Sequence, residues 1–194
     1  MENPAAPLPK LVLHDDANRD SIDPGSIAKN WLQNLQKIIS QDQLGDISYL
    51  FIDDCWWRDI VGLSWNITTK HGTNEISKYL QLQAAKSGFG RFNVIDQGSL
   101  QPRLSDIGGL IWIESGFTFD TKVGSGRGIV RLANVGPLQW KAWIVHTNLD
   151  KLNEFPERPP QEKSNGNVMK DIQVLIIGAG MHSEWIILGG SHSC

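Results

Sequence analysis

The stretch from Gly108 to Leu149 constrains this chain most, because three apolar runs follow one another there with only short polar breaks. The runs cover 108–119, 128–134 and 139–149, and the Gly, Ser and Val-Gly-Pro residues between them predict three antiparallel strands joined by tight turns. Alternation in the first run puts Ile111, Ile113, Phe117 and Phe119 on one face and Trp112, Glu114, Thr118 and Asp120 on the other. A sheet with one apolar face needs a cover, so we expect earlier helices to pack on it.

Three helices are expected before this sheet, at 24–40, 47–52 and 73–86. Asp23 and Pro24 supply an N-cap and a first helical position. The first helix is amphipathic, with apolar residues at helical spacing: Ile27, Trp31, Leu35 and Ile38. Asp46 can cap the second helix, and Thr73 or Asn74 the third.

Strands are predicted at 53–60, 63–70 and 89–95, with a loop at 96–107. This order predicts an α+β fold in which helices cover one face of a curved, mostly antiparallel sheet. Around this domain, at 23–152, we expect an irregular N-terminal arm over 1–22 and a Pro- and Glu-rich linker over 153–170. Residues 171–194 form a separate C-terminal segment.

Composition excludes several classes of function. The chain of 194 residues is 40% apolar, which is enough for a packed core. Its formal charge of -3 provides no basic stripe, so we expect no nucleic-acid partner. No apolar run approaches the ~20 residues that span a bilayer, so no membrane partner is expected either. The N-terminus lacks a signal-peptide pattern, and we expect a cytoplasmic protein.

Two residue types carry further information. Cys55 and Cys194 are too far apart to predict a disulfide framework or a zinc site, and no metal is expected. Cys55, inside an apolar run, is interpreted as a small buried residue. Eight tryptophans indicate a generous core, an aromatic-walled pocket or an interface.

The segment 53–62, Asp-Asp-Cys-Trp-Trp-Arg-Asp-Ile-Val-Gly, resembles part of the ketosteroid isomerases and SnoaL-like polyketide cyclases. These belong to the nuclear transport factor 2-like superfamily, and the resemblance implies its cone-shaped α+β fold. It also implies that Asp59 is the general base, since the family's base occupies the matching place. A carboxylate facing an apolar cone is partly desolvated, which raises its pKa toward values useful for proton transfer.

Structural interpretations stand beside these catalytic ones. Asp59 can equally form an ion pair with Arg58 or cap a turn at the strand end. His146 is the second acid–base candidate, because related dehydratases use an Asp-His pair, but a lone strand histidine is more often a hydrogen-bonded core residue. Glu114 and Arg131 are candidates for substrate binding, or simply a cross-strand pair.

A longer resemblance runs from about residue 45 to 180, where the chain is similar to the N-terminal region of fungal flavin-containing monooxygenase-like proteins. In these a SnoaL-like domain precedes the FAD-binding domain. Residues 171–180 match the start of that second domain, an apolar strand entering Gly178-Ala179-Gly180. Ser183 replaces the third glycine of the fingerprint, and too few residues follow for the rest of the unit. We therefore interpret 171–194 as a vestigial dinucleotide-binding start and expect no cofactor.

Two hypotheses follow. The first is a cofactor-independent isomerase or cyclase of fungal secondary metabolism, acting on a large apolar terpenoid or polyketide by proton transfer or by a pericyclic, Diels–Alder type ring closure. Its catalytic residues would be Asp59 and His146, and its pocket residues Tyr49, Trp57, Trp112, Glu114, Arg131, Trp140 and Trp143. The second is a non-catalytic binding or dimerisation module, or an inactive monooxygenase fragment. A homodimer is expected under either hypothesis.

Overall fold

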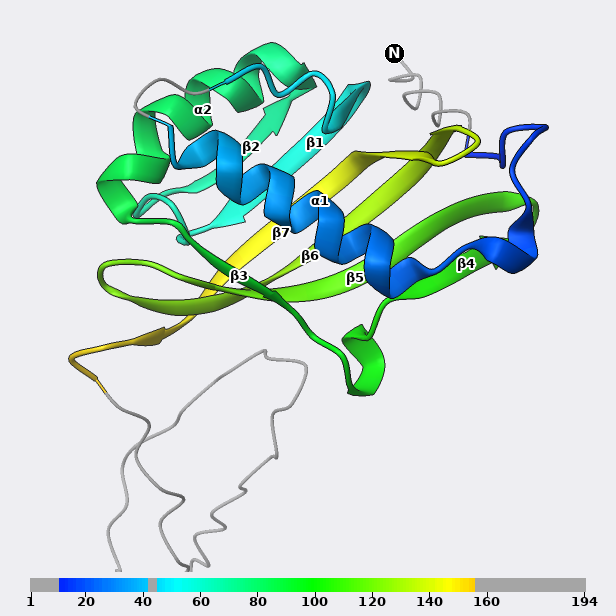
Figure 1. The fold of residues 1–194 in the computed structure, drawn as a ribbon. Helices are drawn as coiled ribbons and strands as arrows, with labels where there is room; N and C mark the ends of the chain where they lie inside the picture. Colours follow the sequence, from blue (N-terminus) through cyan, green and yellow to red (C-terminus); the bar gives the residue numbers. More distant parts are fainter. Residues whose placement is uncertain (1–10, 42–44, 156–194) are drawn as a thin grey trace, which may run out of the picture. The chain divides into compact units, whose positions relative to one another are not determined.

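The computed structural model describes residues 11–41 and 45–155, which form two α-helices, two 3-10 turns and one seven-stranded sheet (Figure 1). The elements, in chain order, are η1 (Arg19–Ser21), α1 (Pro24–Ile39), β1 (Phe51–Ile60), β2 (Ile67–His71), α2 (Gly72–Ser87), β3 (Gly90–Val94), η2 (Gly98–Leu100), β4 (Arg103–Ile107), β5 (Leu110–Asp120), β6 (Gly124–Gly136) and β7 (Gln139–Leu152).

The sheet is mixed, with strand order β2-β1-β7-β6-β5-β3 and with β4 pairing beside β3 on β5. Only β1 and β7 run parallel; every other pairing is antiparallel. The predicted three-stranded meander is confirmed as β5, β6 and β7, the longest strands of the sheet. The two helices cover one side of the sheet (Figure 1), which we call the inner face; the opposite side is the outer face.

Helix α1 forms as its sequence predicts. The Asp23 carboxylate accepts hydrogen bonds from the backbone amides of Gly25 and Ser26, and Pro24 occupies the first position. Its buried stripe contains Ala28, Trp31, Leu32, Leu35 and Ile38. Trp31, Leu32, Leu35 and Ile38 pack on the inner face, so α1 forms one wall of any cavity between helix and sheet.

The inner face is filled by large side chains from both layers. The sheet contributes Phe51, Cys55, Trp57, Ile113, Phe117, Phe119, Val130, Leu132 and Val145, and α2 contributes Ile76, Tyr79 and Leu80. Several rings meet edge to face: Phe89, for example, packs with its centroid 4.9 Å from that of Phe119 and 5.9 Å from that of Trp57. The prediction that Cys55 is a small buried residue is confirmed, and burial raises the pKa of its thiol to about 11.

The prediction of three helices is wrong, because the described residues contain two. Where a helix was expected at 47–52, Asp46 caps only a turn, in which the Leu50 amide donates to the Ile47 carbonyl (2.9 Å). Phe51 then enters β1 opposite Ala142 of β7. Six residues are too few for an independently stable helix, so pairing with the sheet determines their conformation.

The predicted loop at 96–107 is also partly wrong, because it ends in strand β4. Residues Arg103–Ile107 pair with β5 through a hairpin at Gly108 and Gly109, whose φ angles of 60° and 84° suit glycine. The strand is short and mostly polar, so its sequence lacks the alternation that identified the other strands.

The predicted domain boundaries are only partly described. Residues 11–22 are irregular apart from η1, yet Leu11 is buried on the outer face and its carbonyl accepts the Ile111 amide at 2.8 Å. Most of the predicted linker at 153–170 and all of 171–194 lie outside the described residues. Neither helix of the described part is long and apolar enough to cross a membrane.

One test of this packing concerns Gly128 of β6. A Cβ atom there would lie 2.2 Å from the Phe117 ring and 2.6 Å from the His146 carbonyl oxygen. We expect Gly128→Ala to lower the free energy of unfolding by about 1 to 3 kcal/mol through overpacking, measured by urea denaturation. Gly25→Ala, in the first turn of α1, is the control and should be neutral or slightly stabilising. Equal stability of Gly128→Ala and wild type would contradict the packing.

Candidate functional site

Asp59 lies near the end of β1 and is completely buried. Its Oδ1 accepts a hydrogen bond from the Thr147 hydroxyl at 2.5 Å. Its Oδ2 accepts two more, from the Tyr79 hydroxyl at 2.9 Å and from the Leu63 amide at 3.1 Å. The carboxylate thus joins β1, β7, α2 and the turn after β1. Three protein donors thus replace water around this carboxyl group, whose burial without partners would be costly.

The hydrogen bonds continue beyond Asp59 in two directions. The Trp57 indole N–H donates to the Thr147 hydroxyl at 3.1 Å, which connects this series of hydrogen bonds to the core. On the other side the Tyr79 hydroxyl lies 3.3 Å from the hydroxyl of Ser64, a residue that is partly exposed. The series Trp57, Thr147, Asp59, Tyr79 and Ser64 therefore connects the core to the surface near the β1–β2 turn.

The turn after β1 fits closely around the carboxylate. Val61 has a φ of 50°, a left-handed conformation that β-branched residues rarely adopt. A Cβ on Gly62 would lie 2.7 Å from Asp59 Oδ1, so only glycine fits beside the acid. Of the two structural interpretations of Asp59, the geometry matches the turn cap, because Oδ2 accepts the Leu63 amide, whereas Arg58 bonds to Thr69 instead (2.6 Å).

His146 lies on the other face of the sheet. In the β1–β7 register His146 is opposite Arg58, and Asp59 is opposite Thr147, so the histidine and the acid point to opposite sides. The imidazole is half-buried, and this burial, together with the Arg58 charge, lowers the pKa of His146 although Asp59 acts in the opposite direction. The structure does not bring Asp59 and His146 together as a pair.

Four of the expected pocket residues lie on the outer face. Glu114 forms ion pairs with Arg131, at 2.7 Å, and with Arg103. The Arg131 guanidinium also lies 5.8 Å from the ring centre of Trp112. Trp112 and Trp143 pack with Leu11 and Ala133, and the indole N–H of Trp112 is buried without a partner among the described residues. Glu114 and Arg131 therefore form a cross-strand pair, and their role in substrate binding stays a prediction.

Trp57 and Tyr49 occupy two further places. Trp57 is part of the inner core and is fully buried. Tyr49 is half exposed and lines a hollow of about 410 Å³ beside α1 together with Trp140, Asn30 and Asn34. The seven expected pocket residues thus lie in three separate regions, and the structure does not assemble them around Asp59.

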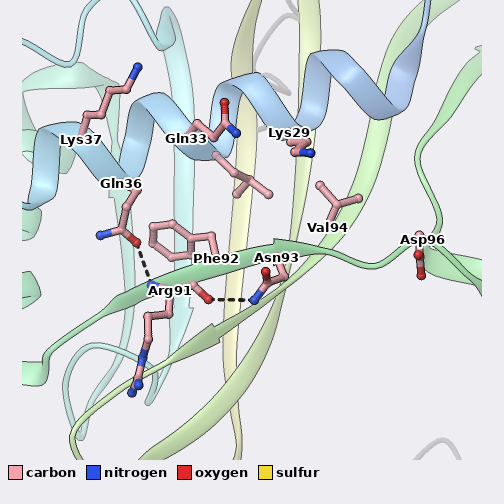
Figure 2. A pocket seen from close by; sticks show the side chains of 10 residues that line it. Lys29, Gln33, Gln36, Lys37, Arg91, Phe92, Asn93, Val94 and Asp96 are labelled. Atoms are coloured by element: carbon pink, nitrogen blue, oxygen red, sulfur yellow. Dashed lines mark hydrogen bonds between the residues drawn. The ribbon is translucent and has the colours of Figure 1, made fainter.

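A larger groove runs between α1 and β3 (Figure 2). It encloses about 900 Å³, and Leu32 of α1 with Phe92 and Val94 of β3 supply its apolar part. Its polar residues are Lys29, Gln33, Gln36, Lys37, Arg91, Asn93 and Asp96. The Gln36 side-chain oxygen accepts the Arg91 amide at 2.7 Å, which holds Arg91 in a left-handed conformation (φ 55°) and fixes β3 against α1.

Sequence reasoning missed this groove and the partners of Asp59. Tyr79 shares the buried stripe of α2 with Ile76 and Leu80. Thr147 lies two residues after Val145 and so faces the same side of its strand, which made both Tyr79 and Thr147 recognisable as inward-facing. Their contact with Asp59 depends on strand register, which no local pattern predicts. Among residues 11–41 and 45–155, no three His, Cys, Asp or Glu side chains are grouped as metal ligands.

Several solved structures are similar to this chain at low sequence identity. A ketosteroid isomerase candidate from Parabacteroides distasonis is 19% identical over 70% of this chain and 95% of its own, with a TM-score of 0.44. ActVI-ORFA from Streptomyces coelicolor is 15% identical over 64% of this chain and 92% of its own, with a TM-score of 0.43. A nuclear transport factor 2-like superfamily protein from Salmonella enterica is 16% identical over 70% and 94%, with a TM-score of 0.42.

No protein-family model and no curated protein matches the chain. Similarity of this extent transfers no activity from the solved structures to this protein.

The buried hydrogen-bond series predicts a specific pH dependence. Burial raises the pKa of Tyr79 from 10.0 to about 12, with the Asp59 charge acting in the same direction and the Ser64 hydrogen bond opposing it. Because the folded pKa exceeds the unfolded one, this contribution to stability is complete below about pH 10 and is lost as the pH rises toward about 12. The free energies of unfolding of wild type and Tyr79→Phe, compared across this pH range by denaturation, measure this contribution. A Tyr79→Phe variant with the same alkaline loss as wild type would contradict the prediction.

Proposed function

We propose that residues 23–152 form a small-molecule-binding domain of the SnoaL-like, nuclear transport factor 2-like kind, whose ligand lies in the groove between α1 and β3. The observation that carries the proposal is the groove itself. Its volume of about 900 Å³ falls within the range of ligand sites, and its apolar residues are flanked by polar ones.

The packing of the inner face supports this location. In many cone-shaped sites the ligand would lie between helices and sheet, but here Trp57, Phe117 and Phe119 fill that region and are fully buried. Both oxygens of Asp59 are already bonded to protein donors. Four hollows formed by the described residues have linings that contain neither Asp59 nor His146. A ligand of any size is therefore accommodated more readily beside α1 than above Asp59.

A blocking substitution tests the groove. Gln33 is exposed on the α1 side of the groove, so Gln33→Trp would fill the space without disturbing the core. We expect this variant to bind Nile red, a neutral apolar probe, at least about tenfold more weakly than wild type in a fluorescence titration, which corresponds to about 1.4 kcal/mol.

Gln81→Trp is the matched control, because Gln81 is an exposed glutamine on α2 and lies outside the groove. It should bind Nile red as wild type does. Equal binding by Gln33→Trp and wild type would reject the groove as the site.

The second candidate function is the cofactor-independent isomerase or cyclase, with Asp59 as general base. The specific observation in its favour is that Asp59 accepts a hydrogen bond from Tyr79, whose hydroxyl contacts that of the partly exposed Ser64. The strained Val61 lies between Asp59 and Ser64 in the sequence. Strained backbone is often found at active sites. A terpenoid or polyketide substrate would have to displace part of the packing around this carboxylate. The homodimer and the relation to fungal monooxygenase-like proteins remain predictions.

Proton exchange distinguishes this candidate from a pure binding domain. If Asp59 is a base, wild type should accelerate deuterium incorporation next to the carbonyl of the bicyclic ketone decalone in D₂O, measured by NMR. Asp59→Asn should abolish the acceleration, and His146→Ala should retain it, because His146 lies on the outer face. Unchanged circular dichroism of Asp59→Asn is the folding control. Exchange by wild type at the rate of buffer alone would eliminate the general-base role.

A further inference from the structure

We infer that the groove between α1 and β3 selects amphipathic anions, namely molecules with an apolar body and one carboxylate or similar negative head group. This inference rests on the proposed function and adds to it the chemical class and the orientation of the ligand. It is based on the charges that line the groove and on how each of them is paired.

The cations of the groove differ in their partners. Lys29 and Lys37 both line it from α1, and neither forms an ion pair within residues 11–41 and 45–155. Arg91 is already paired with Asp120 at 3.0 Å, and its guanidinium points away from α1 (Figure 2). The two lysines are therefore the unpaired cations of the groove. Lys37 extends away from β3 in Figure 2, so this exposed side chain would turn toward the groove to meet a ligand. The excess of the two lysines over the single acid Asp96 favours an anion.

The position of Asp96 gives the groove a direction. Lys29 and Lys37 are eight residues apart on one helix, which separates them by about 12 Å along the axis. Asp96 and Lys29 together also line a neighbouring hollow of about 430 Å³, whereas Lys37 and Asp96 lie toward opposite ends of the groove (Figure 2). Because the acid offsets the Lys29 charge, the most positive end is that of Lys37. The head group is expected there.

The rest of the groove suits the body of such a molecule. Leu32, Phe92 and Val94 provide the apolar contact of the groove, with Val94 lying toward Asp96 (Figure 2). Val94 also lines the neighbouring hollow, which continues to Pro24 and Pro102, so a chain that passes Val94 finds further space. Gln36 is engaged by Arg91 and Ser40, but the Gln33 amide has no hydrogen-bond partner in the described part of the chain and can donate to a carboxylate near Lys37.

Three probes of equal chain length test the charge selectivity: decanoate, decanol and decyltrimethylammonium, each used to displace Nile red from the intact chain. We expect decanoate to displace the dye at about two- to fivefold lower concentration than decanol, the range that an exposed ion pair provides. Decyltrimethylammonium should be weaker than decanol. The advantage of decanoate should shrink as salt is added.

Substitutions then locate the head group. Lys37→Gln should remove the preference for decanoate over decanol, and Lys29→Gln should reduce it less. Lys78→Gln, an exposed lysine of α2 outside the groove, is the matched control and should leave the preference unchanged.

The outcomes separate this inference from the proposed function. If decanol displaces the dye as well as decanoate, or if Lys78→Gln weakens the preference as much as Lys37→Gln, the charge selectivity is overturned. If Gln33→Trp still removes dye binding in that case, the groove remains the binding site. If Gln33→Trp leaves dye binding unchanged, both the groove and its selectivity are rejected.

Discussion

The hydrogen bonding of the buried Asp59 carboxylate is the interaction on which much of this domain depends. A charge fully removed from water is tolerated only when donors replace its solvent. Here Thr147 from β7, Tyr79 from α2 and the Leu63 amide from the following turn supply them. Correct placement of the acid therefore requires the parallel register of β1 on β7 and the packing of α2 on the sheet. The strained Val61 and the close fit of Gly62 belong to the same arrangement.

The bonding of Asp59 to protein donors limits its use as a general base. A general base needs room for a substrate atom within hydrogen-bond distance, and here that space is occupied by protein donors and by aromatic rings packed on the inner face. The same residues that satisfy Asp59 thus close the interior of the domain. Open volume remains on the two flanks of α1, where the helix meets β3 on one side and the β6–β7 hairpin on the other. Under the proposed function a ligand would contact mainly residues outside the buried interior, because Leu32 alone among the groove's lining residues belongs to the buried core.

Local patterns in the sequence predicted a large part of this architecture. Alternation located β5, β6 and β7, and a strong N-cap located α1. The helix predicted at 73–86 is α2, although its N-cap is His71 and not Thr73 or Asn74. The failures have identifiable causes. The segment at 47–52 has helix-compatible residues but is too short to be helical against competing sheet pairing, and β4 is too polar and short to show alternation. The eight tryptophans left a core, a pocket wall and an interface open, and their number could not show that Trp57 belongs to the inner core whereas Trp112 packs in a separate cluster.

The sequence by itself determined which faces of the strands and helices are apolar, that Asp59 lies at the end of a strand, and that the domain is α+β. These properties depend on residue spacing along a single element. Only the tertiary structure decided that Asp59 meets Tyr79 and Thr147, that His146 faces the opposite side, and that Lys29 and Lys37 flank a groove against β3. Such contacts join residues far apart in the chain, and they depend on strand register and helix placement, which the packing of the whole domain sets.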